Sequence, residues 1–101
     1  MKKVWRKSRK DYTDGVLGIY DNNGKSFDRY TVVYDPWEYQ GKLIFPYLAM
    51  SDNPFHPQGF AQHGELSFRY TKQSGEKVIN FSELPVDCQK VIESDLQEYS
   101  I

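Results

Sequence analysis

The stretch GVLGIYDNNGKSFDRYTVVY, residues 15–34, decides the fold that this sequence can adopt. Residues 15–20 and 29–34 are rich in β-branched and aromatic side chains, which are enriched in strands. Between them lies Asn23-Gly24, a strong hairpin signal, because a type I′ turn needs a positive φ at both central residues. The stretch therefore predicts an antiparallel hairpin that turns at Asn23-Gly24.

A turn centred on Asn23-Gly24 also sets which residues of the two strands face each other. Leu17 then lies opposite Tyr30, and Ile19 lies opposite Asp28. One face of the hairpin becomes the expected core face and carries Leu17, Ile19, Tyr30, Val32 and Tyr34. Asp28, close to the turn, is expected at the edge of the sheet in water.

Further strands are predicted downstream of a connection over residues 35–42. Residues 43–50, LIFPYLAM, form an apolar run in which Pro46 marks an edge, a bulge or a bend, because proline cannot donate to a ladder. Residues 65–71, ELSFRYT, alternate between apolar and polar side chains, which predicts a strand with one buried face. Residues 77–81 complete the predicted sheet as a last short strand.

The C-terminal segment changes to a helical period. Its apolar stripe consists of Leu84, Cys88, Val91, Ile92, Leu96 and Tyr99. Ser82 is the expected N-cap, and Pro85 suits the first turn, where its missing N–H is not needed. Because Cys88 lies on the inner stripe, we expect a buried structural thiol there instead of a nucleophile.

Strands followed by one helix predict an α+β fold, a curved antiparallel sheet of four or five strands with one C-terminal helix packed on it. An SH3-like barrel with an appended helix is the alternative. With 101 residues the chain is expected to form a single domain, residues 1–101, in which residues 1–10 are a basic N-terminal arm. A single cysteine, no signal peptide and no apolar run of about 20 residues predict a cytoplasmic protein outside the membrane.

The arm is the most asymmetric feature of the charge distribution. Six of the 13 basic residues lie in residues 1–10 with none of the 14 acidic ones, so the body of the chain is acidic. Such an arm either docks on the acidic body or reaches an anionic partner such as nucleic acid. The candidate nucleic-acid residues are Lys2, Lys3, Trp5, Arg6, Lys7, Arg9 and Lys10.

Residues 51–65, SDNPFHPQGFAQHGE, predict a long ordered loop that holds both histidines, His56 and His63. These histidines could bind a metal together with Glu65, or one of them could act in a hydrolase-type reaction, although their spacing matches no known signature. The favoured interpretation is structural, with the imidazoles bonding to loop groups and with Phe55 and Phe60 pinning the loop to the core. We therefore expect no metal and no cofactor.

Three segments resemble an uncharacterised family of small bacteriophage and mobile-element proteins. They are NNGKSFDRYTVVY at residues 22–34, LAMSDNPFHPQGFAQHGE at 48–65 and INFSELPVDCQKVIESDL at 79–96. The family pattern is a GKxxDRYTVV segment followed by an MSxxPFHPQGFxQH segment and a C-terminal helix. The resemblance implies a compact phage or bacterial accessory protein in the host cytoplasm, and it assigns no catalytic residues.

These observations favour a non-enzymatic binding or regulatory protein that acts on a host or phage macromolecule, with a protein as the favoured partner. Exposed loops with aromatic and amide side chains are typical interface material. The expected binding surface comprises His56, Gln58, Gln62, His63, Trp37 and Tyr39. A metal-binding protein or hydrolase using His56 and His63, and a nucleic-acid-binding protein using the arm, are the alternatives.

Overall fold

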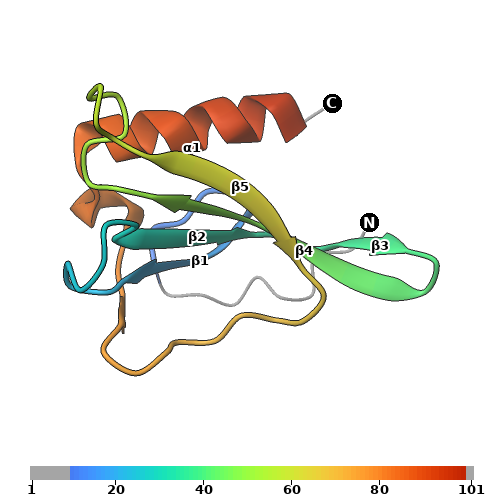
Figure 1. The fold of residues 1–101 in the computed structure, drawn as a ribbon. Helices are drawn as coiled ribbons and strands as arrows, with labels where there is room; N and C mark the ends of the chain where they lie inside the picture. Colours follow the sequence, from blue (N-terminus) through green and yellow to red (C-terminus); the bar gives the residue numbers. More distant parts are fainter. Residues whose placement is uncertain (1–9, 100–101) are drawn as a thin grey trace.

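The structure is a computed structural model, and it describes residues 10–99. Its elements are β1 (Val16–Asp21), β2 (Tyr30–Tyr34), β3 (Trp37–Tyr39), β4 (Lys42–Met50), β5 (Ala61–Leu66), β6 (Lys77–Val78), η1 (Phe81–Glu83) and α1 (Val86–Tyr99). The predicted α+β class is confirmed, since one C-terminal helix packs on an antiparallel sheet (Figure 1). Over residues 10–99 the sheet has six strands instead of four or five, and one of them, β3, forms from part of the predicted connection.

The strands pair in the order β3-β4-β2-β1-β6, and β5 adds to β4. β4 is the longest strand, and β3 and β2 pair with successive parts of it. Pro46 lies between these two parts and opposite Glu65 of β5, so the residue that cannot donate to a ladder lies where β4 changes its partner on the β2–β3 side. Within residues 10–99 these pairings leave the sheet open, and the SH3-like barrel is not confirmed.

The main core lies between α1 and one face of the sheet. Cys88 and Ile92 of α1 are fully buried against Ile19, Val32 and Leu48 of the sheet. Burying an aliphatic side chain of this size contributes about 1.5–3 kcal/mol, so these contacts stabilise the packing of α1 on the sheet. The prediction of a buried thiol is confirmed: the Cys88 thiol donates to the Ser51 carbonyl at 3.4 Å, and burial raises its pKa to about 12.

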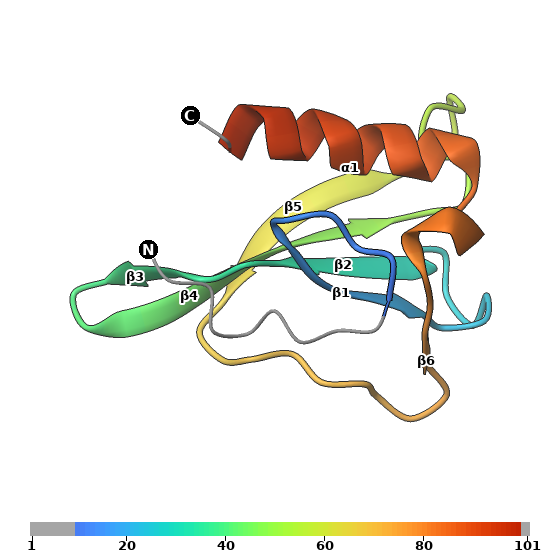
Figure 2. The ribbon, with the colours of Figure 1, turned by 180° about the vertical axis from the view of Figure 1, so that it is seen from behind.

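The sheet is also partly covered on its other face. Val33 and Phe45 are buried but lie on the face opposite the core cluster, as strand alternation requires. Figures 1 and 2 show the segment that follows β5 passing across this side of the sheet toward β6. The sheet is therefore a middle layer between α1 and that irregular segment.

The predicted register of the first hairpin is wrong. Ile19 pairs with Val32 and Asp21 pairs with Tyr30, so the connecting loop spans residues 22–29 instead of two residues. Asn23 and Gly24 do adopt positive φ values of 64° and 80°, but they form a turn at the tip of that loop. Because the register differs by an even number of residues, the predicted core face of β2 is retained.

Leu17 does not join the core, contrary to the prediction. A β-bulge between Val16 and Gly18 shifts the register of β1, and Val16 takes the buried place opposite Tyr34. Leu17 is left partly exposed at the bulge. A bulge gives two residues to one partner, so the alternation on which the prediction relied breaks at this point.

The predicted strand over residues 65–71 and the predicted loop over residues 51–65 are also corrected. β5 occupies residues 61–66, pairing Met50 with Ala61 and Phe45 with Leu66. Residues 67–76 are irregular, and Phe68 is 58% exposed. Pairing with the long strand β4 thus outweighs the higher intrinsic strand preference of the segment that follows.

The helix begins later than predicted. Ser82 lies inside η1, where its amide and that of Phe81 donate to the carboxylate of Asp11 at 3.1 and 2.5 Å. The Pro85 carbonyl accepts the first bond of α1 from the Gln89 amide at 3.0 Å. Ser82 is therefore not the N-cap, and Asp11 stabilises the turn that precedes α1.

Candidate functional site

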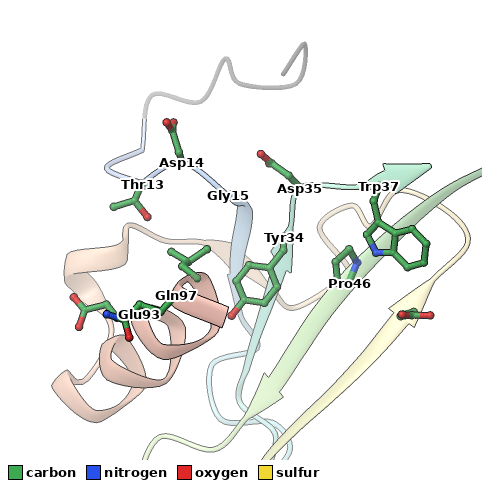
Figure 3. A pocket seen from close by; sticks show the side chains of 11 residues that line it. Thr13, Asp14, Gly15, Tyr34, Asp35, Trp37, Pro46, Glu93 and Gln97 are labelled. Carbon is green, nitrogen blue, oxygen red and sulfur yellow. The ribbon is translucent and has the colours of Figure 1, made fainter. Parts of the chain in front are cut away.

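A groove lies between α1 and the start of the β3–β4 hairpin, on the side of the sheet that α1 covers (Figure 3). It is open to solvent and has a volume of about 1000 Å³. The residues that line it are Thr13, Asp14, Gly15, Tyr34, Asp35, Trp37, Pro46, Glu65, Glu93, Leu96 and Gln97. We call this feature the α1–β3 groove.

The β3–β4 hairpin forms one wall of the groove and projects past the rest of the sheet (Figures 1 and 2). Tyr39 pairs with Lys42 across a two-residue turn, whose residues Gln40 and Gly41 have φ values of 51° and 79°. These values match a type I′ turn, which holds the two strands in a tight twisted ribbon. The hairpin is thus a short arm that carries side chains away from the core.

Trp37 is the aromatic side chain that this hairpin presents to the groove (Figure 3). It is 41% exposed, and its ring meets that of Tyr39 edge to face at a centroid distance of 6.3 Å. Strand alternation places both rings on one face of β3, with Ile44 and Lys42 opposite them on β4. The contact orders Trp37 while leaving part of its surface in water.

The groove is acidic. Glu65 on β5 and Glu93 on α1 are exposed carboxylates that line it together with Asp14 and Asp35. Among the described residues that line the groove, none is Lys, Arg or His. Glu65 and Glu93 are the exposed carboxylates through which the groove can attract a cation.

A partly buried hydrogen-bond junction lies next to the groove and joins three elements, with Asp95 and Tyr34 buried and His63 exposed on one side. Asp95 of α1 is 7% exposed and accepts a 2.5 Å hydrogen bond from the Tyr34 hydroxyl of β2. The Nε2 atom of His63 on β5 lies 2.9 Å from both Asp95 carboxylate oxygens. A buried carboxylate is costly unless it is bonded, so these partners stabilise its position and tie α1 to the sheet.

The two histidines of the predicted loop are not brought together as a site. His63 bonds to Asp95, whereas the Nδ1 atom of His56 accepts from the Gln58 amide at 3.1 Å within an exposed turn. Over residues 10–99, no group of three or more His, Cys, Asp or Glu side chains could hold a metal ion. His56, His63 and Glu65 thus do not form the metal cluster that the alternative requires.

The loop is ordered differently from the prediction. Phe55 is 60% exposed, so it does not pin the loop to the core. The loop ends are joined instead by Ser51, whose amide donates to the Phe60 carbonyl at 2.9 Å and whose hydroxyl accepts from the Phe60 amide at 3.0 Å. Phe60 contacts Phe27 at a ring-centroid distance of 6.1 Å, so only one of the two predicted aromatic pins is half-buried.

The six residues of the predicted binding surface lie in separate places. Trp37 lines the groove, Tyr39 lies farther along the hairpin, and His63 joins the junction next to the groove. His56 and Gln58 lie together on the 51–60 loop. Gln62 points to the opposite face of the sheet, where it borders a smaller hollow of about 470 Å³ with Tyr47 and Phe68.

Glu93 was not among the predicted site residues, because a charge on the outer face of a helix is usually only solvated. Asp35 and Pro46 belong to the groove only because the chain turns into β3 beside them. The pattern Trp37-Glu38-Tyr39, followed by Gln40-Gly41, is the signal that could have revealed this hairpin in the sequence.

The arm residues Lys2, Lys3, Trp5, Arg6, Lys7 and Arg9 lie outside the described part of the chain, so the nucleic-acid alternative stays a prediction. Lys10 is described and is half-buried.

Comparisons with protein families, with curated proteins and with solved structures returned no match. The resemblance to the phage and mobile-element family therefore stays an expectation.

Residues 10–99 contain no helix with the length and apolar character that crossing a bilayer requires.

Proposed function

We propose that this protein is a small non-enzymatic accessory protein, of phage or mobile-element type, that binds a partner protein through the α1–β3 groove. The observation that carries the proposal is Trp37, an aromatic side chain held 41% exposed at the rim of a groove by a projecting hairpin. Tryptophan is enriched among the residues that dominate interface energetics, especially beside a cavity that a partner side chain can fill.

The shape of the groove supports a macromolecular partner. It is an open channel between a helix and a hairpin, and the apolar surfaces of Pro46 and Leu96 lie among its polar lining residues. Small-molecule sites usually enclose most of the ligand surface, whereas a protein segment needs only an open track with an apolar anchor point. The groove is open and has an apolar anchor point, so it suits a protein segment better than a small molecule.

The chemistry near the groove also supports binding over reaction. His63 is linked to the groove through Asp95 and Tyr34. Its Nε2 atom is hydrogen-bonded to Asp95, which also accepts a hydrogen bond from the Tyr34 hydroxyl. This arrangement accounts for the three polar groups as a structural junction between β2, β5 and α1. The hydrolase alternative with His56 and His63 stays a prediction.

Nucleic acid is a poor occupant of this groove. Glu65 and Glu93 would repel phosphates, which dominate the affinity of proteins for nucleic acids. A nucleic-acid function would have to use the basic arm and not the groove.

The test compares partner capture by the full chain and by two matched alanine variants. Trp37→Ala removes the exposed aromatic of the groove, and Phe68→Ala removes an aromatic of similar exposure, 58%, on the opposite side of the sheet. Proteins captured from host lysate are quantified for each variant. Loss of a captured protein with Trp37→Ala but not with Phe68→Ala supports the proposal, and equal capture by all three chains contradicts it.

A further inference from the structure

We infer that two copies of this chain pair through the free edge of β5, as antiparallel strands related by a twofold axis at Gly64. The sheets of the two copies then join into one continuous sheet. This inference goes beyond the proposed function, because it concerns the edge of the sheet and does not require a partner in the α1–β3 groove. It follows from the pairing of β5 and from the order of its residues.

β5 is an edge strand that presents main-chain groups to its outer side. It pairs with β4 alone among the described strands, so it is the last strand on its side of the sheet (Figure 1). Pro46 has no N–H and lies opposite Glu65, so this pair is of the non-hydrogen-bonded kind. The two kinds of pair alternate along an antiparallel ladder, so the N–H and C=O groups of His63 and Glu65 face away from β4. The bond from the Ser51 amide to the Phe60 carbonyl agrees with this alternation.

The opposite edge of the sheet, along β1, is covered. Tyr20 and Asp21 pair with β6. The Ile19 carbonyl accepts from the Ile79 amide at 3.0 Å, and the Ile19 amide donates to the Tyr12 hydroxyl at 3.2 Å. β5 instead contains no proline, no lysine and no register shift, which are among the devices that protect exposed edges. The contrast indicates that the edge of β5 is open to another strand.

α1 leaves room beside this edge. The helix residues Cys88 and Ile92 are buried with residues of β1, β2 and β4, and among the described residues β5 contributes none to that core cluster. The helix meets β5 through the hydrogen bond between Asp95 and His63, and the His63 side chain stays 49% exposed. A second strand can therefore lie along β5 without displacing α1.

The order of residues in β5 selects one register for this pairing. A twofold axis at Gly64 places His63 of each copy opposite Glu65 of the other, and these two pairs make about four main-chain hydrogen bonds. An axis at Glu65 would place two like charges opposite each other, which is destabilising. An axis at His63 would pair Glu65 with Ala61 and the two imidazoles with each other. Only the axis at Gly64 gives each glutamate an imidazole neighbour.

The face of β5 that points away from α1 also suits this axis. A Cβ atom at Gly64 would lie only 2.6 Å from the ring of Tyr47, so this ring occupies the place of a side chain on Gly64. Tyr47 thus extends from β4 over β5 toward the free edge. In the pair the two glycines are neighbours, and the two Tyr47 rings approach each other with no side chain of residue 64 between them. Cross-strand aromatic contacts of this kind stabilise paired strands.

The experiment measures the mass of the full chain by sedimentation equilibrium over a range of concentrations. We expect the mass to rise from one copy to two copies as the concentration increases. A few main-chain hydrogen bonds and a small interface predict a weak dimer, with a Kd below about 1 mM.

Two substitutions at one position separate main-chain pairing from charge. In Glu65→Pro the missing N–H removes a bond to the second copy but none to β4, and Gly64 has no Cβ to clash with the proline ring. Glu65→Thr removes the same charge and keeps the N–H. We expect Glu65→Pro to weaken the dimer at least about tenfold, and Glu65→Thr to weaken it at most about threefold.

Hydrogen exchange of the unsubstituted chain provides a second measurement that does not depend on how the variants fold. The amides of His63 and Glu65 should be protected at high concentration and lose this protection on dilution. The amides of Gln62 and Gly64 face β4, so they should stay protected at every concentration.

Three outcomes would overturn the inference. They are a single-copy mass up to about 1 mM, equal weakening by Glu65→Pro and Glu65→Thr, and exchange of the His63 and Glu65 amides that does not change with concentration. If the chain stays monomeric while Glu65→Pro loses a lysate protein that Glu65→Thr retains, then the edge binds a strand of another protein and the inferred dimer is wrong.

Discussion

Two turns of this protein have nearly the same backbone but different consequences. Asn23-Gly24 has φ values of 64° and 80°, and Gln40-Gly41 has φ values of 51° and 79°. A Cβ atom added to Gly24 or to Gly41 would meet nothing within 4 Å. The second turn joins paired residues directly, whereas the first lies at the tip of an eight-residue loop, residues 22–29.

The difference comes from the side chains around the first turn. Asp21 accepts from the Asn23 amide at 2.8 Å, and Asn22 accepts through its side chain from the amides of Gly24 and Lys25 at 2.8 and 3.1 Å. The Asn23 side chain also donates to the Gly75 carbonyl at 2.9 Å. These bonds let the turn exist without a ladder on either side, so the turn residues alone do not set the register.

Removing the anchor of the first turn should have the largest effect on stability. Asp21 is buried and pairs with Arg29 at 2.8 Å, in addition to its bond from the Asn23 amide. Asp21→Ala should lower the free energy of unfolding by about 1.5–3 kcal/mol, as expected for hydrogen bonds to a charged group. Urea unfolding followed by circular dichroism measures this loss, and a loss below about 0.5 kcal/mol would show that the loop is held by other contacts.

The same residue predicts a dependence on pH. Burial alone would raise the pKa of Asp21, but the bonds from Arg29 and from the Asn23 amide outweigh it and place the pKa below the ordinary value of 3.8. A folded-state pKa below the unfolded one gives stability that is complete above about pH 4 and is lost as the pH falls through the folded-state value. The difference between wild type and Asp21→Ala should therefore shrink below about pH 4 and stay constant from pH 5 to 7.

Gly24→Val tests whether the first turn contributes to global stability. Valine resists positive φ, so the variant should be destabilised by about 1–2 kcal/mol, because β1 and β2 are central to the core. Thermal unfolding measures the change. An unaltered melting temperature would mean that the 22–29 loop can adopt another conformation without disturbing β1 and β2.

Gly41→Val applies the same strain to the second turn and should cost less global stability, about 0.5 kcal/mol. Because the hairpin projects from the body, it can open locally while the core stays folded. The expected signature is faster amide hydrogen exchange confined to residues 37–44. If the variant lost as much global stability as Gly24→Val, the hairpin would belong to the cooperative core.

The smallest expected effect is an increase in stability instead of a loss. Gln40 adopts a φ of 51°, a conformation that Asn tolerates several-fold better than most residues. Gln40→Asn should slow hydrogen exchange in residues 37–44 and raise global stability by only about 0.3 kcal/mol. Faster exchange in this variant would show that the Gln40 side chain stabilises the hairpin in a way that the turn type does not explain.

The fold class followed from the sequence because it depends on patterns that span many residues. The β-branched run of β2 and the helical stripe around Cys88 and Ile92 occupy the predicted places. The sequence-based prediction was wrong where a few local contacts determine the backbone, as at the β-bulge beside Leu17. The location of β5 depends on the length of β4, a tertiary constraint that periodicity in residues 65–71 does not contain.

The candidate site was harder to predict than the fold. Trp37 was expected on a binding surface, and it lines the groove, but the other residues that line the groove, such as Glu65 and Glu93, are far from it in the sequence. A groove forms from the distance between elements, and that distance depends on how α1 crosses the sheet. Residue types can suggest an exposed aromatic, but they cannot show which charges will lie beside it.

The junction at Asp95 has a consequence for the way this sequence can evolve. Its carboxylate binds Tyr34 and His63, and each of the three residues comes from a different element. Losing either partner alone would leave a buried acid poorly compensated, whereas replacing all three with apolar residues of similar volume removes the need for any of them. In sequences related to this one, positions 34, 63 and 95 are therefore expected to change together, as a polar set or as an apolar set.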